Sequence, residues 1–234
     1  MQVTLSNEIL LILNLVVVFG GVLLFYKLFQ TTGLICFTVF ATITANIEVM
    51  LLVDAFGMEQ TLGNIMFAST FLITDILSET EGKKKAREAV LVGIHTSLAF
   101  IVISHFWLMF TPSENDWAYP YMETIFSNTP RIMVAGFLVY AVVQWFDVWI
   151  YHKWWDFTTK RFGNRQGFLW LRNNGSTLIS QLLNAFLFNF AAFGSVYDVK
   201  TLVSISLSTY VIYFATSILD TPFIYLARRM HRSF

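Results

Sequence analysis

The chain is short of charge. Of its 234 residues only 13% are Asp, Glu, Lys or Arg, against roughly 25% in soluble proteins. Hydrophobic residues make up 56%, and the mean hydropathy is +0.61. This composition indicates an integral membrane protein. The formal net charge is zero, so the chain lacks the basic face that replaces phosphate counterions, and we expect no nucleic-acid partner.

The sequence also lacks the residues of common catalytic and metal sites. Cys36 is the single cysteine, so the chain forms no internal disulfide, and no other metal ligand lies at a useful spacing from it. His95 and His105 are about 15 Å apart along a helix and do not share a metal ion. The sequence contains neither a glycine-rich phosphate loop nor a nucleophile paired with a base. We expect no enzyme activity, no ATP hydrolysis, no metal and no other cofactor.

Long apolar runs dominate the chain. A helix needs about 20 apolar residues to cross a bilayer, and six such runs lie near residues 8–29, 33–54, 88–110, 131–152, 173–195 and 201–227. A seventh run, 61–79, is shorter and more polar. The sequence predicts an all-α integral membrane protein, a bundle of about seven transmembrane helices with one short member, in a single domain over residues 1–234.

Basic residues fall mainly on one side of this arrangement. When the short run counts as a crossing, the loops of one side hold 13 lysines and arginines, and those of the other hold only Arg131 and Lys200. Cytoplasmic loops are enriched in Lys and Arg, so the N-terminus is predicted outside and the C-terminus in the cytoplasm. The thirteen are Lys27, Lys83, Lys84, Lys85, Arg87, Lys153, Lys160, Arg161, Arg165, Arg172, Arg228, Arg229 and Arg232.

The short run ends in the segment FLITDILSETEGKKKAR, residues 71–87, which joins two acids to four basic residues. An Asp at mid-bilayer costs about 2.5–3.5 kcal/mol on insertion scales, and no Lys or Arg is expected at the depth of Asp75. Asp75 must therefore face a partner, a cavity or a substrate. Glu79 lies one turn nearer the basic residues, and we expect it to pair with Lys83 at the cytoplasmic end.

Other polar residues in the spans recur at helical spacing, which places them on single helix faces. Serines and threonines in such stripes commonly pack against neighbouring helices without a further role. Amides and carboxylates are costlier to bury, so they point more strongly to function. The candidate substrate-binding residues are Asn46, Glu48, Asp75, Gln144, Asp147, Asn174, Gln181, Asn184 and Asp220.

These inward groups indicate the kind of ligand. Acids and amides without a fixed cation suit a neutral or cationic molecule and disfavour phosphates and organic anions. A planar, nucleobase-like heterocycle fits best, because a carboxylate accepts two parallel N–H donors, an amide serves a carbonyl or ring nitrogen, and aromatic rings stack on the plane. With 24 Phe and 7 Trp, stacking partners are plentiful, but the sequence does not locate them.

Several blocks of sequence resemble one known family. They follow one another in the family's order and are Thr74-Asp75 with Ser78-Glu79 and residues 82–87, Gln144-x-x-Asp147, LRNNGST at 171–177 leading to Ser180-Gln181, and LDTPF at 219–223. The chain resembles the queuosine precursor transporter family, also described as putative vitamin uptake transporters. The resemblance implies import of 7-cyano-7-deazaguanine, 7-aminomethyl-7-deazaguanine or a related base across a prokaryotic cytoplasmic (inner) membrane.

The chain departs from the family pattern at two places. Thr80-Glu81 stands where the family usually has Val-Tyr, and Asn184 stands where many members carry Asp. An amide does not titrate, so Asp147 and Asp75 are stronger candidates than Asn184 for carrying a proton.

Alternatives to a stand-alone transporter remain. A substrate-capturing subunit of a multi-component vitamin importer would bind the same ligand but would need separate ATPase and coupling subunits. The polar helix faces also allow self-association, for instance as a homodimer. Facilitated diffusion with metabolic trapping and proton-coupled transport through a buried aspartate are both compatible with the sequence.

Overall fold

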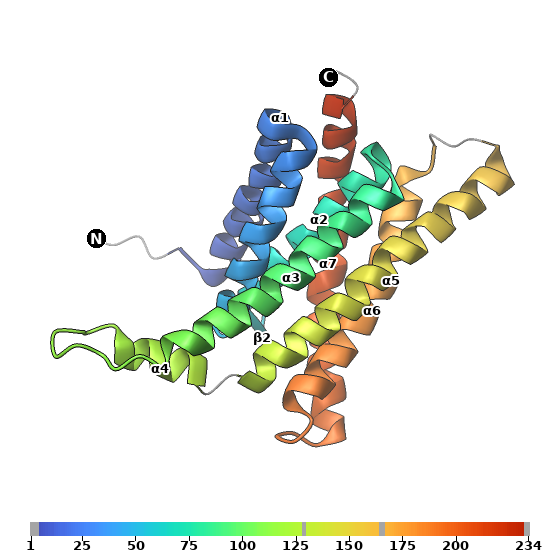
Figure 1. Ribbon diagram of the computed structural model, residues 1–234. Coiled ribbons are helices and arrows are strands. Elements are labelled where there is room, and N and C mark those ends of the chain that lie inside the picture. Colours follow the sequence, from blue (N-terminus) through green and yellow to red (C-terminus); the bar gives the residue numbers. More distant parts are fainter. Residues whose placement is uncertain (1–4, 128–129, 164–166, 232–234) are drawn as a thin grey trace.

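The computed structural model describes residues 5–127, 130–163 and 167–231. Its elements follow one another as α1 (Asn7–Glu48), β1 (Leu52–Ala55), β2 (Met58–Thr61), α2 (Gly63–Thr80), α3 (Lys83–Trp107), α4 (Tyr119–Ser127), α5 (Pro130–Phe162), α6 (Leu169–Phe193) and α7 (Val199–His231). The long helices lie side by side as a bundle, and α4 lies at one end of it (Figure 1).

Helix α1 folds back on itself. Gln30 has φ 51° and ψ −137°, outside the helical region, and the two arms on either side of it run next to each other (Figure 1). The arms correspond to the predicted runs 8–29 and 33–54. The turn is tight, because a Cβ atom on Gly33 would overlap the main-chain carbonyl of Phe25 in the preceding arm. The absence of a side chain at Gly33 therefore lets the arms approach.

Alanine at Gly33 is expected to destabilise the protein by about 1–3 kcal/mol, because the added methyl group meets main chain that has no rotamer through which to move away. Gly20→Ala is the matched control, since a Cβ there meets no atom within 4 Å. Alanine at Gly20 should stabilise the helix by about 0.5–1 kcal/mol. Thermal unfolding of the purified proteins measures both changes, and equal shifts in Tm would contradict the close contact at Gly33.

The second arm is shorter than predicted. We expected the run 33–54 to be helical, whereas the helix ends at Glu48 and residues 52–61 form an antiparallel hairpin with Leu52 opposite Thr61. The hairpin turns through Phe56 and Gly57, both with positive φ, as a two-residue turn requires. The helix was predicted to continue through residues 51–53 because they are apolar. The turn at Phe56 and Gly57 instead places residues 52 and 53 in a strand.

Helix α2 is the predicted short member and lies within the bundle. Its 18 residues rise about 27 Å, and all of them except Phe67, Glu79 and Thr80 are buried. It packs against α1, α3, α5 and α7. Protein therefore surrounds this helix, which explains why its sequence is more polar than that of its neighbours.

The fold is that of an all-α membrane protein apart from the small hairpin. Five helices of the described chain are long and apolar enough to span a membrane: Asn7–Glu48, Lys83–Trp107, Ile132–Phe162, Leu169–Phe193 and Val199–His231. The folded-back α1 counts once among them, and α2 is too polar to count. Between the predicted runs 88–110 and 131–152 lies the additional helix α4.

The two ends of the bundle differ in charge. The turn of α1, the α2–α3 turn, the end of α5, the start of α6 and the end of α7 lie at the same end of the bundle (Figure 1). These segments hold the basic residues assigned to one side, of which Arg165 and Arg232 lie outside the described residues. The hairpin and α4 lie at the opposite end. We call the bundle end with the basic residues the basic end and the bundle end with the hairpin and α4 the hairpin end.

Candidate functional site

A pocket lies between the helices in the half of the bundle nearer the hairpin end. The space between its walls is about 660 Å³, a figure that includes the part open to the exterior. Its walls come from α1, β2, α2, α3, α5, α6 and α7. The lining residues carry hydroxyl, amide, aromatic or aliphatic side chains and no charge: Thr42, Ala45, Asn46, Val49, Thr61, Gly63, Asn64, Phe67, Thr70, Ser97, Ile132, Met133, Gly136, Tyr140, Asn184, Phe188 and Tyr213.

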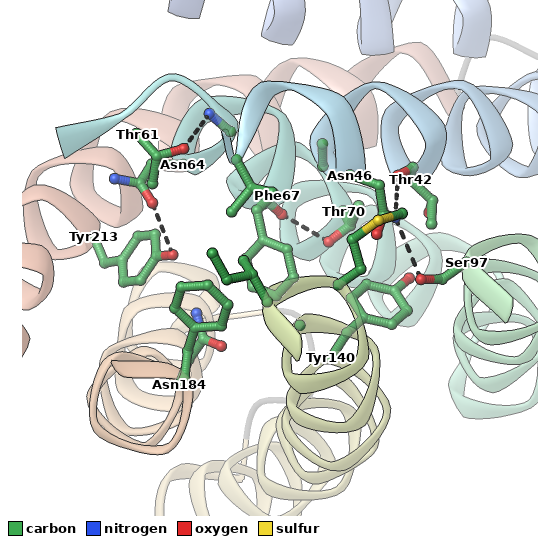
Figure 2. Close-up of a pocket in the computed structure, with 17 residues that line it drawn as sticks. Thr42, Asn46, Thr61, Asn64, Phe67, Thr70, Ser97, Tyr140, Asn184 and Tyr213 are labelled. Atoms are coloured by element: carbon green, nitrogen blue, oxygen red, sulfur yellow. Dashed lines mark hydrogen bonds between the residues drawn. The ribbon is translucent and has the colours of Figure 1, made fainter. Parts of the chain in front are cut away.

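The polar side chains of this pocket form two groups. Asn64, Tyr213 and Asn184 lie on one side of Phe67 (Figure 2). Tyr213 donates a hydrogen bond of 3.1 Å from its hydroxyl to Oδ1 of Asn64. The amides and hydroxyls therefore flank an aromatic ring, an arrangement that suits a flat ligand with polar edges.

The second group lies on the other side of Phe67 (Figure 2). Asn46 donates from Nδ2 to the carbonyl of Thr42 at 2.8 Å and to Oγ of Ser97 at 3.3 Å. The ring of Tyr140 meets the ring of Phe67 edge-on, with centroids 5.6 Å apart. Together the two groups offer hydrogen-bonding partners at opposite edges of the pocket.

A row of buried carboxylates lies against one face of α6. Each is held by a different α6 side chain: Asn173 donates to Oδ1 of Asp220 at 2.7 Å, Thr177 donates to Oδ2 of Asp75 at 3.1 Å, and Ser180 lies 2.5 Å from Oδ1 of Asp147. The aspartates come from α7, α2 and α5. None of the six side chains belongs to a residue more than 2% exposed. We call these six residues the aspartate row.

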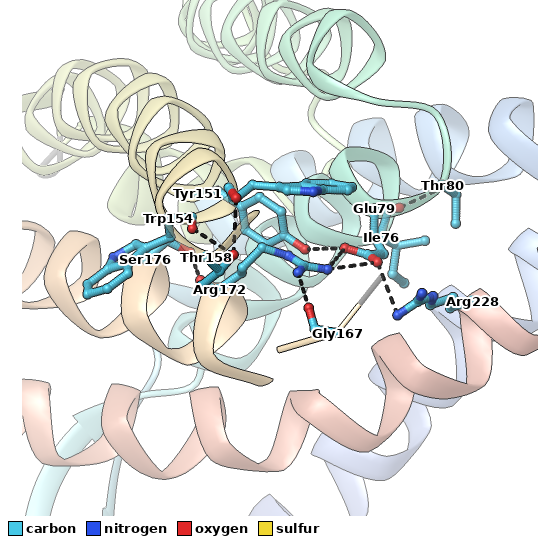
Figure 3. A network of polar contacts seen from close by, with 11 residues as sticks. Ile76, Glu79, Thr80, Tyr151, Trp154, Thr158, Gly167, Arg172, Ser176 and Arg228 are labelled. Atoms are coloured by element: carbon cyan, nitrogen blue, oxygen red, sulfur yellow. Dashed lines mark hydrogen bonds and ion pairs between the residues drawn. The ribbon is translucent and has the colours of Figure 1, made fainter. Parts of the chain in front are cut away.

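An ionic cluster closes the basic end. Glu79 of α2 pairs with Arg172 of α6 at 2.8 Å and with Arg228 of α7 at 3.3 Å, and it accepts a hydrogen bond of 3.0 Å from Tyr151 of α5 (Figure 3). Arg172 also donates to the carbonyl of Gly167. The cluster thus joins four helices around one carboxylate.

Two expectations about this end were wrong. Glu79 was expected to pair with Lys83, and Arg172 was expected in an inner loop. Arg172 is instead fully buried, stacked at 4.4 Å over the ring of Trp155. It lies in the first turn of α6, four and eight residues before Ser176 and Ser180, a helical spacing that could have placed it inside the bundle. A buried cation therefore does lie in the bundle, paired with Glu79, which is one helical turn from Asp75.

The structure brings some of the predicted site residues together and separates others. Asn46 and Asn184 line the pocket. Gln144 donates at 2.6 Å to the pocket residue Thr70, and Gln181 accepts at 3.3 Å from Asn184. These four amides therefore form or support the pocket, through α1, α5 and α6.

The other five predicted residues lie elsewhere. Asp75, Asp147 and Asp220 are in the aspartate row. Asn174 donates at 2.8 Å to Thr221 nearer the basic end, and Glu48 is half-buried beside the hairpin; neither lines the pocket. Asn64 was not among the predicted site residues; it lies in the short run 61–79, just after the hairpin. An amide side chain inside a predicted span was the sequence signal that could have identified Asn64 as a site residue.

Comparison with known proteins gives two matches. A family model described as "Putative vitamin uptake transporter" matches residues 61–227. A curated protein of Bacillus subtilis (strain 168), named "Probable queuosine precursor transporter", is 38% identical over 209 residues, which is 89% of this chain and 89% of the relative. No solved structure matches.

Proposed function

Because the chain belongs to the putative vitamin uptake transporter family, we propose that it imports 7-deazaguanine precursors of queuosine. The resemblance read from the sequence blocks is confirmed. The chain is a transporter and not an enzyme, and it is a multi-pass membrane protein of the bacterial inner membrane. The precursors considered are 7-cyano-7-deazaguanine and 7-aminomethyl-7-deazaguanine.

The observation that supports this substrate class is the uncharged pocket with amides on both sides of an aromatic ring. A deazaguanine has a flat ring system, N–H donors on one edge and carbonyl and nitrogen acceptors on others. Asparagine amides supply both donors and acceptors, and rings such as Phe67 and Tyr140 supply contact area. Since no lining side chain is charged, the neutral cyano base fits this pocket better than the aminomethyl cation.

We further propose seven crossings, with the N-terminus outside and the C-terminus in the cytoplasm. The two arms of α1 then count separately and α2 counts as a crossing. The basic end faces the cytoplasm, in agreement with the enrichment of Lys and Arg in inner loops. In this orientation the pocket lies in the outer half and the Glu79 cluster closes the cytoplasmic end, so the substrate enters from outside and leaves after this cluster separates.

Asn64→Ala is expected to weaken binding of 7-cyano-7-deazaguanine about tenfold, because the ligand loses a partner in a buried site. Binding of the labelled base to purified protein measures this change, with Asn115→Ala, in the exposed segment before α4, as the matched control. Wild-type affinity in both Asn64→Ala and Asn184→Ala, at unchanged Tm, would rule out this pocket as the binding site.

Reconstitution of the chain alone distinguishes the transporter from a substrate-capturing subunit. We expect purified protein in liposomes to exchange external labelled base for unlabelled base inside, without any ATPase. Tight binding without exchange would favour the multi-component importer instead.

A further inference from the structure

We propose that Asp147 carries a proton that enters the cell together with the substrate, so that transport is driven by the proton gradient. The proposal rests on the proposed function and adds its energy source. It is built on the contact between Asp147 and Ser180, on the unpaired oxygens around them, and on the amides that connect this contact to the pocket.

The hydroxyl of Ser180 has one hydrogen and three acceptors within reach. It lies 3.0 Å from the carbonyl of Ser176, 3.1 Å from the carbonyl of Thr177, and 2.5 Å from Oδ1 of Asp147. Serines in membrane helices commonly donate to the preceding turn of their own helix. When Ser180 does so, the short contact with Asp147 needs a hydrogen from the carboxyl group, which is present only in the protonated acid.

The burial of the carboxylates also favours the protonated form of Asp147. Oδ2 of Asp147 and Oδ1 of Asp75 are buried without a hydrogen-bond partner among the described residues. An ionised carboxylate without donors or a cation is costly in such a place. Binding a proton removes the charge and supplies a donor, so these unpaired oxygens point to a proton as the ligand.

Charged and titratable groups on several helices surround Asp147. Asp75 on α2 and Asp220 on α7 interact electrostatically with Asp147 itself, Glu79 on α2 and Tyr151 on α5 interact with Asp75, and Arg172 on α6 interacts with Tyr151. Arg87 on α3 stacks instead on Trp145. The positive charge of Arg172 is paired with the carboxylate of Glu79. No ion pair connects an aspartate of the row to a cation in the part of the chain that the structure describes, so the row has room for a positive charge.

A metal ion fits this row poorly. The aspartates contact α6 at Asn173, Thr177 and Ser180, and seven residues of helix span about 10 Å. Within the described ranges no three acidic, histidine or cysteine side chains converge on one point. A sodium ion needs several oxygens around one centre, whereas a proton needs one carboxyl group.

Two amides connect Asp147 to the pocket. Gln144 lies one turn from Asp147 on α5 and donates to Thr70 in the pocket wall. Gln181 follows Ser180 on α6 and accepts from Asn184, which also lines the pocket. A base that rearranges these amides alters the surroundings of Asp147. The proton then travels inward with the base and leaves when the Glu79 cluster separates.

The experiment uses liposomes containing the full chain, with labelled 7-cyano-7-deazaguanine and a pH-sensitive dye inside. With the outside one pH unit more acidic, we expect the wild type to accumulate the base about tenfold if one proton accompanies each molecule. The lumen should acidify only when the base is present. Asp147→Asn should lose both effects, whereas Asp54→Asn, the same change on the exposed hairpin, should retain both.

Other outcomes overturn the proposal. They are gradient-driven accumulation by Asp147→Asn, wild-type uptake that ignores the pH gradient, and uptake that follows a sodium gradient. The proton movement measured with the wild type does not depend on the folding of any variant. Asp147→Glu, which keeps the carboxyl group, should retain part of this proton movement. Binding of the base without proton movement sinks only the coupling. Absence of binding to the wild type sinks the proposed function as well.

Discussion

Replacement of Glu79 by alanine is expected to lower the Tm of the purified protein by roughly 6–20 °C. Removal of one partner from a buried ion pair costs about 3–5 kcal/mol, and 1 kcal/mol corresponds to about 2–4 °C in a protein of this size. Without Glu79, the fully buried Arg172 loses its carboxylate and stands beside a second cation, Arg228. Both effects act against folding.

Removal of the cation of this pair, Arg172, should destabilise the protein less than removal of Glu79. In Arg172→Met, Glu79 keeps Arg228 and the hydroxyl of Tyr151, so no charge is left alone in the cluster. The double variant Glu79→Ala/Arg172→Met should be more stable than Glu79→Ala alone. Glu88→Ala, which breaks a half-exposed pair with Lys85, is the control and should change stability by less than about 1 kcal/mol. Equal losses for Glu79→Ala and Glu88→Ala would contradict a buried ionic cluster.

Alanine at Gly93 is expected to reduce affinity for the base roughly thirtyfold while the protein remains folded. A Cβ atom there would overlap the hydroxyl of Tyr140 and lie 2.8 Å from its Cζ. Tyr140 is buried and forms part of the pocket wall, so its ring has to move towards Phe67 and into the ligand space. Overpacking of this kind costs about 1–3 kcal/mol, and about 2 kcal/mol corresponds to the stated loss.

A double-mutant cycle tests the cause. Tyr140→Ala removes the ring, so the added methyl group at Gly93 then has nothing to displace, and Gly93→Ala/Tyr140→Ala should bind the base as Tyr140→Ala does. Additive losses would mean that Gly93 acts through something other than Tyr140. Gly20→Ala, where the methyl group meets open space, should leave the affinity unchanged.

Hydropathy predicted the helical elements well because a membrane span needs one simple property, a long apolar stretch. The predicted runs 88–110 and 173–195 became α3 and α6 with ends shifted by a few residues. Charge counting needs only the order of the loops, and the topology that it predicts remains the one proposed above. The hairpin at 52–61 was not predicted because its first strand begins with the apolar pair Leu52-Val53, which continues the preceding apolar run, and only the pair Phe56-Gly57 marks the turn.

The candidate site was harder to predict, because it depends on which helices meet. Spacing placed Gln144 and Asp147 on one face of α5 but did not reveal that Asp147 meets Ser180 while Gln144 meets Thr70. Arg172 was assigned to an inner loop because it precedes the predicted run 173–195, and its partner, Glu79, is 93 residues away in the sequence. Pairings across such distances require the three-dimensional arrangement.

The burial of α2 has a consequence for biosynthesis. This helix places Asp75 inside the bundle and obtains its cover partly from α5 and α7, which the ribosome makes later. In the proposed topology α2 is an early crossing to be synthesised, and because lipid offers no hydrogen-bonding partner to its polar face, α2 becomes fully stable only after α5 and α7 have been inserted. The order of synthesis and the order of assembly therefore differ, and α2 must be protected, by the insertion machinery or by partial exposure to water, until the C-terminal helices arrive.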